Sequence, residues 1–430
     1  MTFTRAVGIG CALAAGALLA FAAAGGCSDD QPSGTAQAAA PPSEPVAFGP
    51  GPNATTAAAA EPAGDEAEAA APSEDRYRDP MTVQGQQARG LYYTAMFLRR
   101  HGVEGVVRSV KRARLDAAVI DVKDAAGRMG YETDIEILKP QNEGYLGDEA
   151  RAFVARLREE NIYSIARVSC FADPQLPVRH PEHAIQDARP RRRGQAWTSW
   201  GTGHAWLDPY SEHNHQLVID LAKEVEALGF DEIQLDYIRF PVDDGTALAI
   251  YPTETDQPRD ELLLGLLRRI DEAVSIPISV DVFGLTAFRD GDPPELGQHL
   301  EEWTAHVEVY SPMLYLNSMR NWMRGDRDRV FVLVHNGIAN MRRRLGDEPV
   351  IRPFLQGFRR GADYWNPQFI TRQIQAAKQG GADGFLFWST SSNFEMVKHA
   401  MVGPARRLSP FPIARRERLR AERWGTATDR

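Results

Sequence analysis

The stretch GFDEIQLDYIRFP (229–241) carries a short, β-rich, largely apolar run directly behind a helix-like segment, and this unit decides the fold of the chain. The run EIQLDYIRF (232–240) follows an amphipathic segment at 212–228. Strands and helices that alternate in this way predict βαβ units and a parallel sheet with helices packed on it.

The same unit recurs on both sides of 232–240. Seven further β-rich runs are RGLYYTA (89–95), AAVIDVKD (117–124), YSIARVSCF (163–171), PISVDVFG (277–284), VEVYSPMLY (307–315), IRPFLQGF (351–358) and GFLFWS (384–389). Further helix-like segments lie at 148–160, 260–274 and 367–379. Eight such units predict an α/β fold, the (β/α)8 TIM barrel. An open doubly wound sheet is the alternative, but no glycine-rich dinucleotide fingerprint follows the first run.

Composition restricts the barrel to residues 85–407. Residues 28–84 are mainly Ala, Pro, Gly, Ser and acidic residues, which cannot bury a core, so they predict a disordered tether. Residues 408–430 form a basic tail, typical of a solvated segment. The net charge of −9 is opposite to the basic footprint of a nucleic-acid-binding protein. One basic cluster is either a solvated loop or a contact for an acidic polymer: Arg189, Arg191, Arg192 and Arg193.

Residues 1–27 have the pattern of an export signal. Arg5 precedes an apolar segment at 6–26, which ends in small residues before Cys27. This resembles a bacterial lipoprotein signal, in which the cysteine is lipidated and becomes the new N-terminus. An uncleaved membrane helix is the alternative, since the segment is long enough to span a bilayer. Both interpretations predict an exported protein of the cell envelope that is held at a membrane.

Charged and polar residues interrupt the apolar runs. Because burying an unpaired charge is costly, each of them must be paired, hydrogen-bonded or exposed at the end of a strand. Strand alternation predicts that Asp121 and Lys123 share one face, as do Gln234 and Asp236. Two interpretations stay open for these residues. They neutralise one another inside the barrel, or they bind a substrate at its C-terminal mouth, where TIM barrels build their sites.

Asp236 and Asp281 are the candidate catalytic pair, on neighbouring strands of the predicted barrel. Glycoside hydrolysis needs two carboxyl groups, one to protonate the leaving oxygen and one to attack or to activate water. Asp236 is predicted as nucleophile or base and Asp281 as acid. The alternative for Asp281 is a buried partner of Arg239 or Lys123.

The loop after the third run, 172–210, is rich in aromatic residues and histidines. The aromatic residues, which predict a wall for sugar rings or simply pack the loop, are Trp197, Trp200, Trp206 and Tyr210, beside Asp208. The histidines of this region, including two at the start of the next helix-like segment, are His180, His183, His204, His213 and His215. Neither HExxH nor paired cysteines occur, so we expect no metal and no cofactor, and a metal-dependent deacetylase is the weaker alternative.

The runs also match, in order, the motifs of a known family. The matching blocks are RGLYYTA, VIDVKDAAGRMGY, IYSIARVSCFADP, WLDPY, GFDEIQLDYIRFP, SVDVFG, ELGQHLEEW, YSPMLY and LQGF, and they cover nearly the whole folded region. On these blocks the chain resembles the "putative glycoside hydrolase domain" family of bacterial envelope and secreted proteins, barrels of the glycosidase superfamily. The resemblance implies a barrel with a saccharide-type site and assigns no substrate.

Two other barrel families differ from this chain on the fourth strand. Chitinase-like barrels read Asp-Gly-x-Asp-x-Asp-x-Glu there, whereas this chain has Ile238 in place of the final Glu, which argues against the substrate-assisted mechanism. Alpha-amylase-like barrels place a nucleophilic Asp after an Arg-x step and an acid on the next strand. Asp236 and Asp281 fit that layout by position, although Gln234 replaces the arginine and Asp replaces the usual Glu.

The sequence therefore predicts a hydrolase of O-glycosidic bonds in an envelope or extracellular polysaccharide. Its partners would be the polysaccharide and, through a lipid on Cys27, a membrane. A non-catalytic glycan-binding lipoprotein on the same fold is the alternative. The residues predicted to bind substrate are Asp121, Lys123, Arg167, Trp206, Asp208, Tyr210, Arg239, Tyr315, Gln356 and Trp388.

Overall fold

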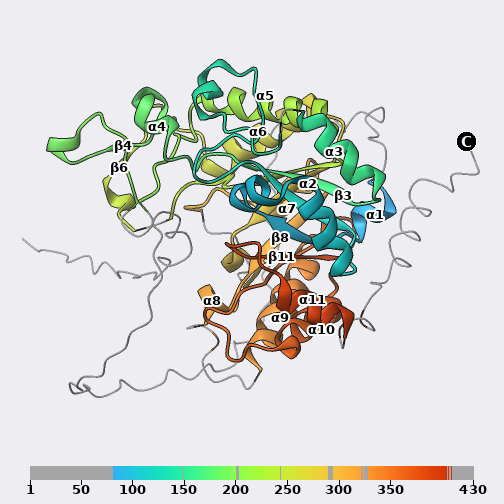
Figure 1. Cartoon of the computed structure of the whole chain (residues 1–430). Helices are drawn as coiled ribbons and strands as arrows, with labels where there is room; N and C mark the ends of the chain where they lie inside the picture. Colours follow the sequence, from blue (N-terminus) through green and yellow to red (C-terminus); the bar gives the residue numbers. More distant parts are fainter. Residues whose placement is uncertain are drawn as a thin grey trace, which may run out of the picture. The chain divides into compact units, whose positions relative to one another are not determined.

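The computed structural model describes residues 81–147, 149–199, 203–242, 244–288, 294–320 and 328–403, with Met323, Ala405 and Leu408 (Figure 1). The predicted export signal with Cys27, the predicted tether as far as residue 80 and nearly all of the basic tail lie outside these residues. Among the described helices, none combines the length and the apolarity needed to cross a bilayer.

Eight parallel strand positions close into a barrel. The sheet order is β10-β11-β1-β2-β3-β5-β7-β8-β9, and a further pairing of β10 with β8 closes it. The strands are β1 (Arg89–Tyr93), β2 (Ala117–Lys123), β3 (Tyr163–Ser169), β5 (Glu232–Asp236), β7 (Ile278–Val282), β8 (Val309–Leu314), β9 (Val350–Ile351), β10 (Phe354–Gln356) and β11 (Phe385–Trp388). β9 and β10 form one barrel position, interrupted at Pro353, which has no N–H for the ladder. Each predicted run contains one of these positions, so the (β/α)8 barrel is confirmed and the open sheet is wrong.

A helix follows each barrel position. These helices are α2 (Ala95–Arg112), α3 (Ala150–Glu159), α5 (Glu212–Leu228), α6 (Arg259–Ala273), α7 (Leu300–Trp303), α9 (Arg329–Leu345), α10 (Pro367–Gly380) and α11 (Glu395–Val402). α10 shows why they form. Asn366 accepts a hydrogen bond from the Gln368 N–H at its start, and Pro367 occupies the first turn. Gly381 then ends the helix in the left-handed conformation at φ 92°, which favours glycine.

The long loops after β3 and β5 join into one extension beside the barrel (Figure 1). Its two-stranded ribbon pairs β4 (Gln186–Asp187) with β6 (Ala249–Ile250), antiparallel. The Trp197 indole N–H donates to the Gly245 carbonyl at 3.1 Å and holds the two loops together. Short helical segments complete the chain: α1 (Val83–Gln86), α4 (Leu176–Arg179), α8 (Leu316–Met319), η1 (Glu136–Gln141), η2 (Pro181–His183), η3 (Pro190–Arg192), η4 (Thr246–Leu248) and η5 (Gly284–Phe288).

The barrel interior is sealed at its N-terminal end. Arg352 and Glu232 form an ion pair without any exposed surface, and the Arg352 Nη1 group donates to the Gly85 carbonyl of α1 at 2.8 Å. Met81 packs below them against Val309 and Val350. Apolar side chains such as Val119 and Ile165 fill the interior above this plug. Any substrate must therefore enter from the opposite, C-terminal end.

Candidate active site

Arg167 lies at the centre of a buried group of charges, which we call the Arg167 cluster: Asp121, Arg167, Asp236 and Asp281. Its Nη1 group donates to Asp121 Oδ1 at 2.5 Å, and its Nε group donates to Asp236 Oδ2 at 3.0 Å. Asp281 Oδ2 lies 3.7 Å from the same Nε atom. The four residues come from β2, β3, β5 and β7, which are neighbours in the barrel. The structure thus brings together the two predicted catalytic carboxyl groups and two of the predicted substrate-binding residues.

The cluster holds three carboxyl groups against one guanidinium group, so its protonation is decided by burial. Burial raises the pKa of Asp281 well above its usual range; the charge of Asp236 and a hydrogen bond to it raise it further, and Arg167 opposes this. Burial also raises the pKa of Asp121 to about 6, against the opposing effect of Arg167. Of the two predicted catalytic residues, Asp281 is therefore the one whose carboxyl group is held toward its protonated form.

Asp236 is the carboxyl group of the catalytic pair that reaches solvent. It keeps 6% of its surface exposed, against 2% for Asp281. Its Oδ1 atom accepts the Tyr237 N–H at 2.7 Å. Tyr237 has a φ of 54°, in the left-handed region that non-glycine residues rarely occupy and that is often found at functional sites. This turn ends β5 directly at Asp236 and fixes the orientation of its carboxylate.

Aromatic side chains line one side of the cluster. Tyr315 and Trp388 stack with ring centres 5.4 Å apart, and Phe358 packs edge-on against Trp388 at 5.5 Å. The Tyr92 hydroxyl donates to the carboxylate of Asp121. Burial and the nearby charges of Asp281 and Asp236 raise the pKa of Tyr315 well above its usual range. Tyr315 and Trp388 were predicted here. Tyr92 and Phe358 were missed, although Tyr92 shares the inward face of β1 with Gly90 by simple alternation.

Three predicted substrate-binding residues have protein partners instead. A register shift between Asp121 and Lys123 removes the expected shared face, so that prediction is wrong. The Lys123 Nζ group lies 3.0 Å from Asp173 Oδ2, and both side chains are fully buried. Asp208 accepts hydrogen bonds from the Thr253 hydroxyl at 2.7 Å and the Thr253 N–H at 3.0 Å, which joins the loops after β3 and β5. Gln356 donates to the carbonyls of Phe358 and Arg360 at 3.0 and 2.9 Å.

The aromatic residues of the loop after β3 mostly pack that loop. Trp197 and Trp206 expose no surface, and Tyr210 packs against Phe240 with ring centres 5.0 Å apart. Trp200 lies outside the described residues. His183 and His213 stack at 3.8 Å, but no group of three or more His, Cys, Asp or Glu side chains within the described ranges is arranged to hold a metal ion.

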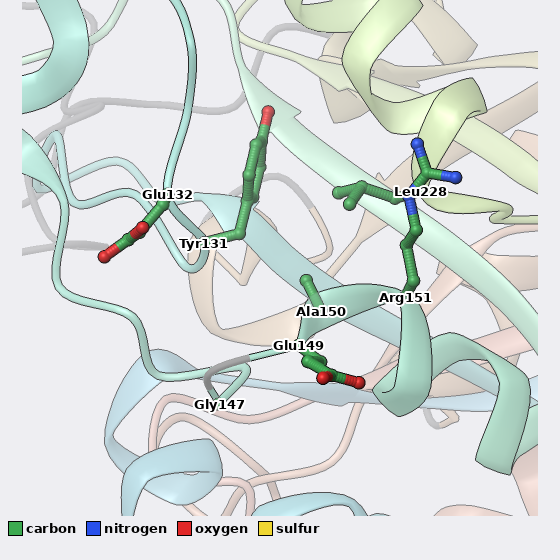
Figure 2. A pocket seen from close by; sticks show the side chains of 7 residues that line it. All are labelled: Tyr131, Glu132, Gly147, Glu149, Ala150, Arg151 and Leu228. Carbon is green, nitrogen blue, oxygen red and sulfur yellow. The ribbon is translucent and has the colours of Figure 1, made fainter.

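Surface hollows occur away from the Arg167 cluster. One of about 350 Å³ lies at the start of α3 (Figure 2), lined by Tyr131, Glu132, Gly147, Glu149, Ala150, Arg151 and Leu228. A second of about 380 Å³ shares Gly147 with it. In the first hollow, the Tyr131 hydroxyl already donates to Glu224 at 2.7 Å. The Arg167 cluster remains the candidate site, since it alone among the described residues joins converging carboxyl groups with raised pKa values.

Comparison with known proteins agrees with the barrel. Among solved structures, the glycoside hydrolase domain of PgaB (BpsB) from Bordetella bronchiseptica is 12% identical, with a TM-score of 0.51 over 75% of this chain and 98% of that one. At this identity the likeness shows the shared fold alone. A hypothetical protein from Ruminiclostridium thermocellum is 28% identical over 45% of this chain and 97% of its own, with a TM-score of 0.39. The α-galactosidase TtGalA from Thermus thermophilus is 15% identical over 77% of this chain and 67% of its own, with a TM-score of 0.48.

No protein of curated function matches the sequence. Residues 90–394 match the model of a family described as "Putative glycosyl hydrolase domain", which takes in every barrel strand from β1 to β11. The chain therefore belongs to this family of glycosyl hydrolase domains.

Proposed function

We propose that the protein hydrolyses O-glycosidic bonds of an envelope or extracellular polysaccharide at the Arg167 cluster. One observation carries the proposal: Asp236 accepts a hydrogen bond from Arg167, while burial raises the pKa of the neighbouring Asp281 carboxyl group well above its usual range. Glycoside hydrolysis uses two carboxyl groups whose environments push their pKa values apart in this way.

The geometry favours Asp236 as a nucleophile over water activation. The Asp281 side chain lies within hydrogen-bond reach of Asp236, and both carboxyl groups contact the same Arg167 nitrogen, at 3.7 and 3.0 Å. An inverting pair needs about 6.5–9.5 Å to admit a water. In the proposed reaction Asp236 attacks the anomeric carbon, the bond to the leaving oxygen breaks, and that oxygen takes the proton of Asp281. Water then cleaves the glycosyl ester and returns the proton to Asp281.

Substrate binding changes one contact in this scheme. Asp281 exchanges its hydrogen bond to Asp236 for one to the glycosidic oxygen, so the two carboxyl groups move apart to the separation of about 5 Å that retaining enzymes use. Trp388, which stacks on Tyr315 and packs against Phe358, offers the sugar an apolar face. In this proposal the N-terminal signal exports the domain, and a lipid on Cys27 holds it at a membrane facing the periplasm or the exterior.

The test is Asp236→Asn with Asp231→Asn as its matched control. Asp231 precedes the same strand at its opposite end, where it accepts hydrogen bonds from the Ser164 N–H and hydroxyl at 2.8 and 2.7 Å. Release of reducing ends from a panel of envelope polysaccharides is measured for each variant, with circular dichroism as the check of folding. We expect Asp236→Asn to lose several orders of magnitude in turnover and Asp231→Asn to keep it. Unchanged turnover in a folded Asp236→Asn variant would refute the assignment.

The ion pairs around Arg167 favour one second function, a non-catalytic glycan-binding protein. They hold all three carboxyl groups and leave little of their surface open. Asp281→Asn distinguishes the two functions: a binding protein would keep its glycan affinity in this variant, and the unaltered protein would release no product from any polymer.

A further inference from the structure

Arg239 is a buried cation outside the Arg167 cluster. Only 7% of its surface is exposed, and its hydrogen bond runs from Nη1 to the Phe240 carbonyl at 3.0 Å. Within the part of the chain that the structure describes, no carboxylate pairs with it. The other two arginines buried as deeply, Arg167 and Arg352, both have carboxylate partners. The side chain is thus mostly withdrawn from water but lacks a carboxylate partner, which leaves its guanidinium group available to a ligand of opposite charge.

Aromatic rings surround the Arg239 guanidinium group. Its carbon lies 4.9 Å from the centre of the Trp206 ring and 5.4 Å from those of Tyr237 and Phe283. Rings in these positions hold a guanidinium group through cation–π contacts and restrict its orientation. None of its nitrogens is among the fully buried polar atoms without a partner, so the N–H groups that Phe240 leaves unused reach solvent.

The same contacts place Arg239 beside the proposed catalytic pair. Tyr237 directly follows Asp236, and Phe283 stands two residues after Asp281. The guanidinium group that rests on both rings therefore lies between the ends of β5 and β7, the strands that carry the two carboxyl groups. A group bound to Arg239 would belong to the sugar that occupies the site, or to its immediate neighbour.

The chemistry of the group follows from the guanidinium fork. Arginine presents parallel N–H donors that match a planar carboxylate, and apolar walls strengthen such a charge-assisted pair. We propose that Arg239 binds the carboxylate of a uronic acid residue, so that the substrate is an acidic polysaccharide. This inference rests on the proposed function. The carboxyl groups of the Arg167 cluster repel an anion, so they orient the sugar with its acidic group toward Arg239.

The experiment measures binding without turnover. Trigalacturonate, triglucuronate and their methyl esters are titrated calorimetrically into the Asp236→Asn variant at low and at physiological salt. We expect at least one acid to bind about tenfold to a hundredfold more tightly than its neutral ester, as hydrogen bonds to a charged group imply. In Asp236→Asn/Arg239→Met this preference disappears because the affinity for the acid falls to that of the ester. Arg239→Lys keeps the charge but loses the paired N–H donors, so it should retain part of the preference for the acid.

Arg259→Met is the matched control. Arg259 also stacks on aromatic rings of this region, 4.4 Å from Phe240 and 5.2 Å from Tyr251, but lies at the start of α6 and donates to the Glu295 carbonyl at 3.0 Å. The Arg259→Met substitution should leave the preference for the acid over its ester unchanged. Equal affinity of the Asp236→Asn variant for acid and ester, or failure of both acids to bind to it, would by itself overturn the inference. A preference for the acid without cleavage by the unaltered protein would support the inference and count against the hydrolase.

Discussion

Replacement of Arg167 by Met tests whether the centre of the site depends on one cation. The substitution removes the ion pairs to Asp121 and Asp236 and keeps an apolar side chain of similar length. It also leaves three carboxyl groups in the barrel mouth without the guanidinium group that now contacts all of them. We expect a large loss of stability that depends on pH.

The expected loss in the free energy of unfolding follows from two costs, that of an unpaired buried charge and that of its protonation. Removal of one partner from a buried ion pair costs about 3–5 kcal/mol. Each carboxyl group can instead take up a proton, at about 1.4 kcal/mol for every pH unit above its unfolded-state pKa near 3.9. That is about 4 kcal/mol at pH 7 and about 1.5 kcal/mol at pH 5. The folded variant then binds more protons than the unfolded chain, so its free energy of unfolding falls as pH rises.

The assay is urea unfolding followed by tryptophan fluorescence between pH 5 and pH 8. Arg167→Met should lose about 3–5 kcal/mol at pH 7 relative to the unaltered protein, and distinctly less at pH 5. The control is Arg372→Met. Arg372 also pairs with a carboxylate, Asp328, and stacks on Phe331 at 4.3 Å, but the ion pair is partly exposed and should contribute about 0–1 kcal/mol. A loss in Arg167→Met that equals the control, or that does not change with pH, would refute the reasoning.

Two further predictions concern buried charges around the site. Lys123→Met leaves the Asp173 carboxylate buried without its cation and should lower the free energy of unfolding by about 3–5 kcal/mol. The double variant Lys123→Met/Asp173→Leu should recover most of this loss in the same urea assay. A double variant no more stable than the single one would contradict the prediction. Asp281→Asn removes a carboxyl group whose raised folded-state pKa makes stability fall as pH rises above about 4. Between pH 5 and pH 8 the free energy of unfolding should therefore fall less in the variant than in the unaltered protein. If the two free energies fall in parallel, Asp281 is ionised in the folded state and the prediction is wrong.

The fold could be predicted from the sequence because each barrel unit carries its own local signal. The helix predicted at 212–228 matches α5 at both ends, since Gly229 in the left-handed conformation at φ 89° stops it. The segment predicted at 367–379 matches α10 within one residue, between Asn366 and Gly381. Alternation failed at Lys123, because the register shift that turns it toward Asp173 depends on how β2 meets β3.

The residues that form the site could be predicted only in part, and for a different reason. Carboxyl ends of parallel strands meet at one mouth of a barrel, so Asp236 and Asp281 could be placed together from strand order alone. The partners of a side chain depend on tertiary distances, which no local pattern contains. Asp208 and Gln356 look like site residues in the sequence, yet Asp208 joins the loops after β3 and β5, and Gln356 accepts the Asn317 N–H at 2.9 Å. Tyr92 and Phe358 look like ordinary core residues, yet Tyr92 donates to Asp121 of the Arg167 cluster and Phe358 packs on Tyr315 and Trp388.

The pKa values of the three carboxyl groups in this site depend on the fold and could not be predicted from the sequence. In the sequence, Asp121, Asp236 and Asp281 are chemically the same group. One guanidinium group cannot neutralise three buried carboxylates, so burial favours the protonated form of at least one of them. Arg167 directs two donors at Asp236 and one at Asp121 and leaves Asp281 at 3.7 Å, so the cation opposes the burial of the Asp281 carboxyl group only in part and the pKa of Asp281 is raised well above its usual range. A carboxylate and a stored proton on adjacent strands are the two components that glycoside hydrolysis requires, and it is Arg167, on the strand before Asp236, that makes two identical residues different.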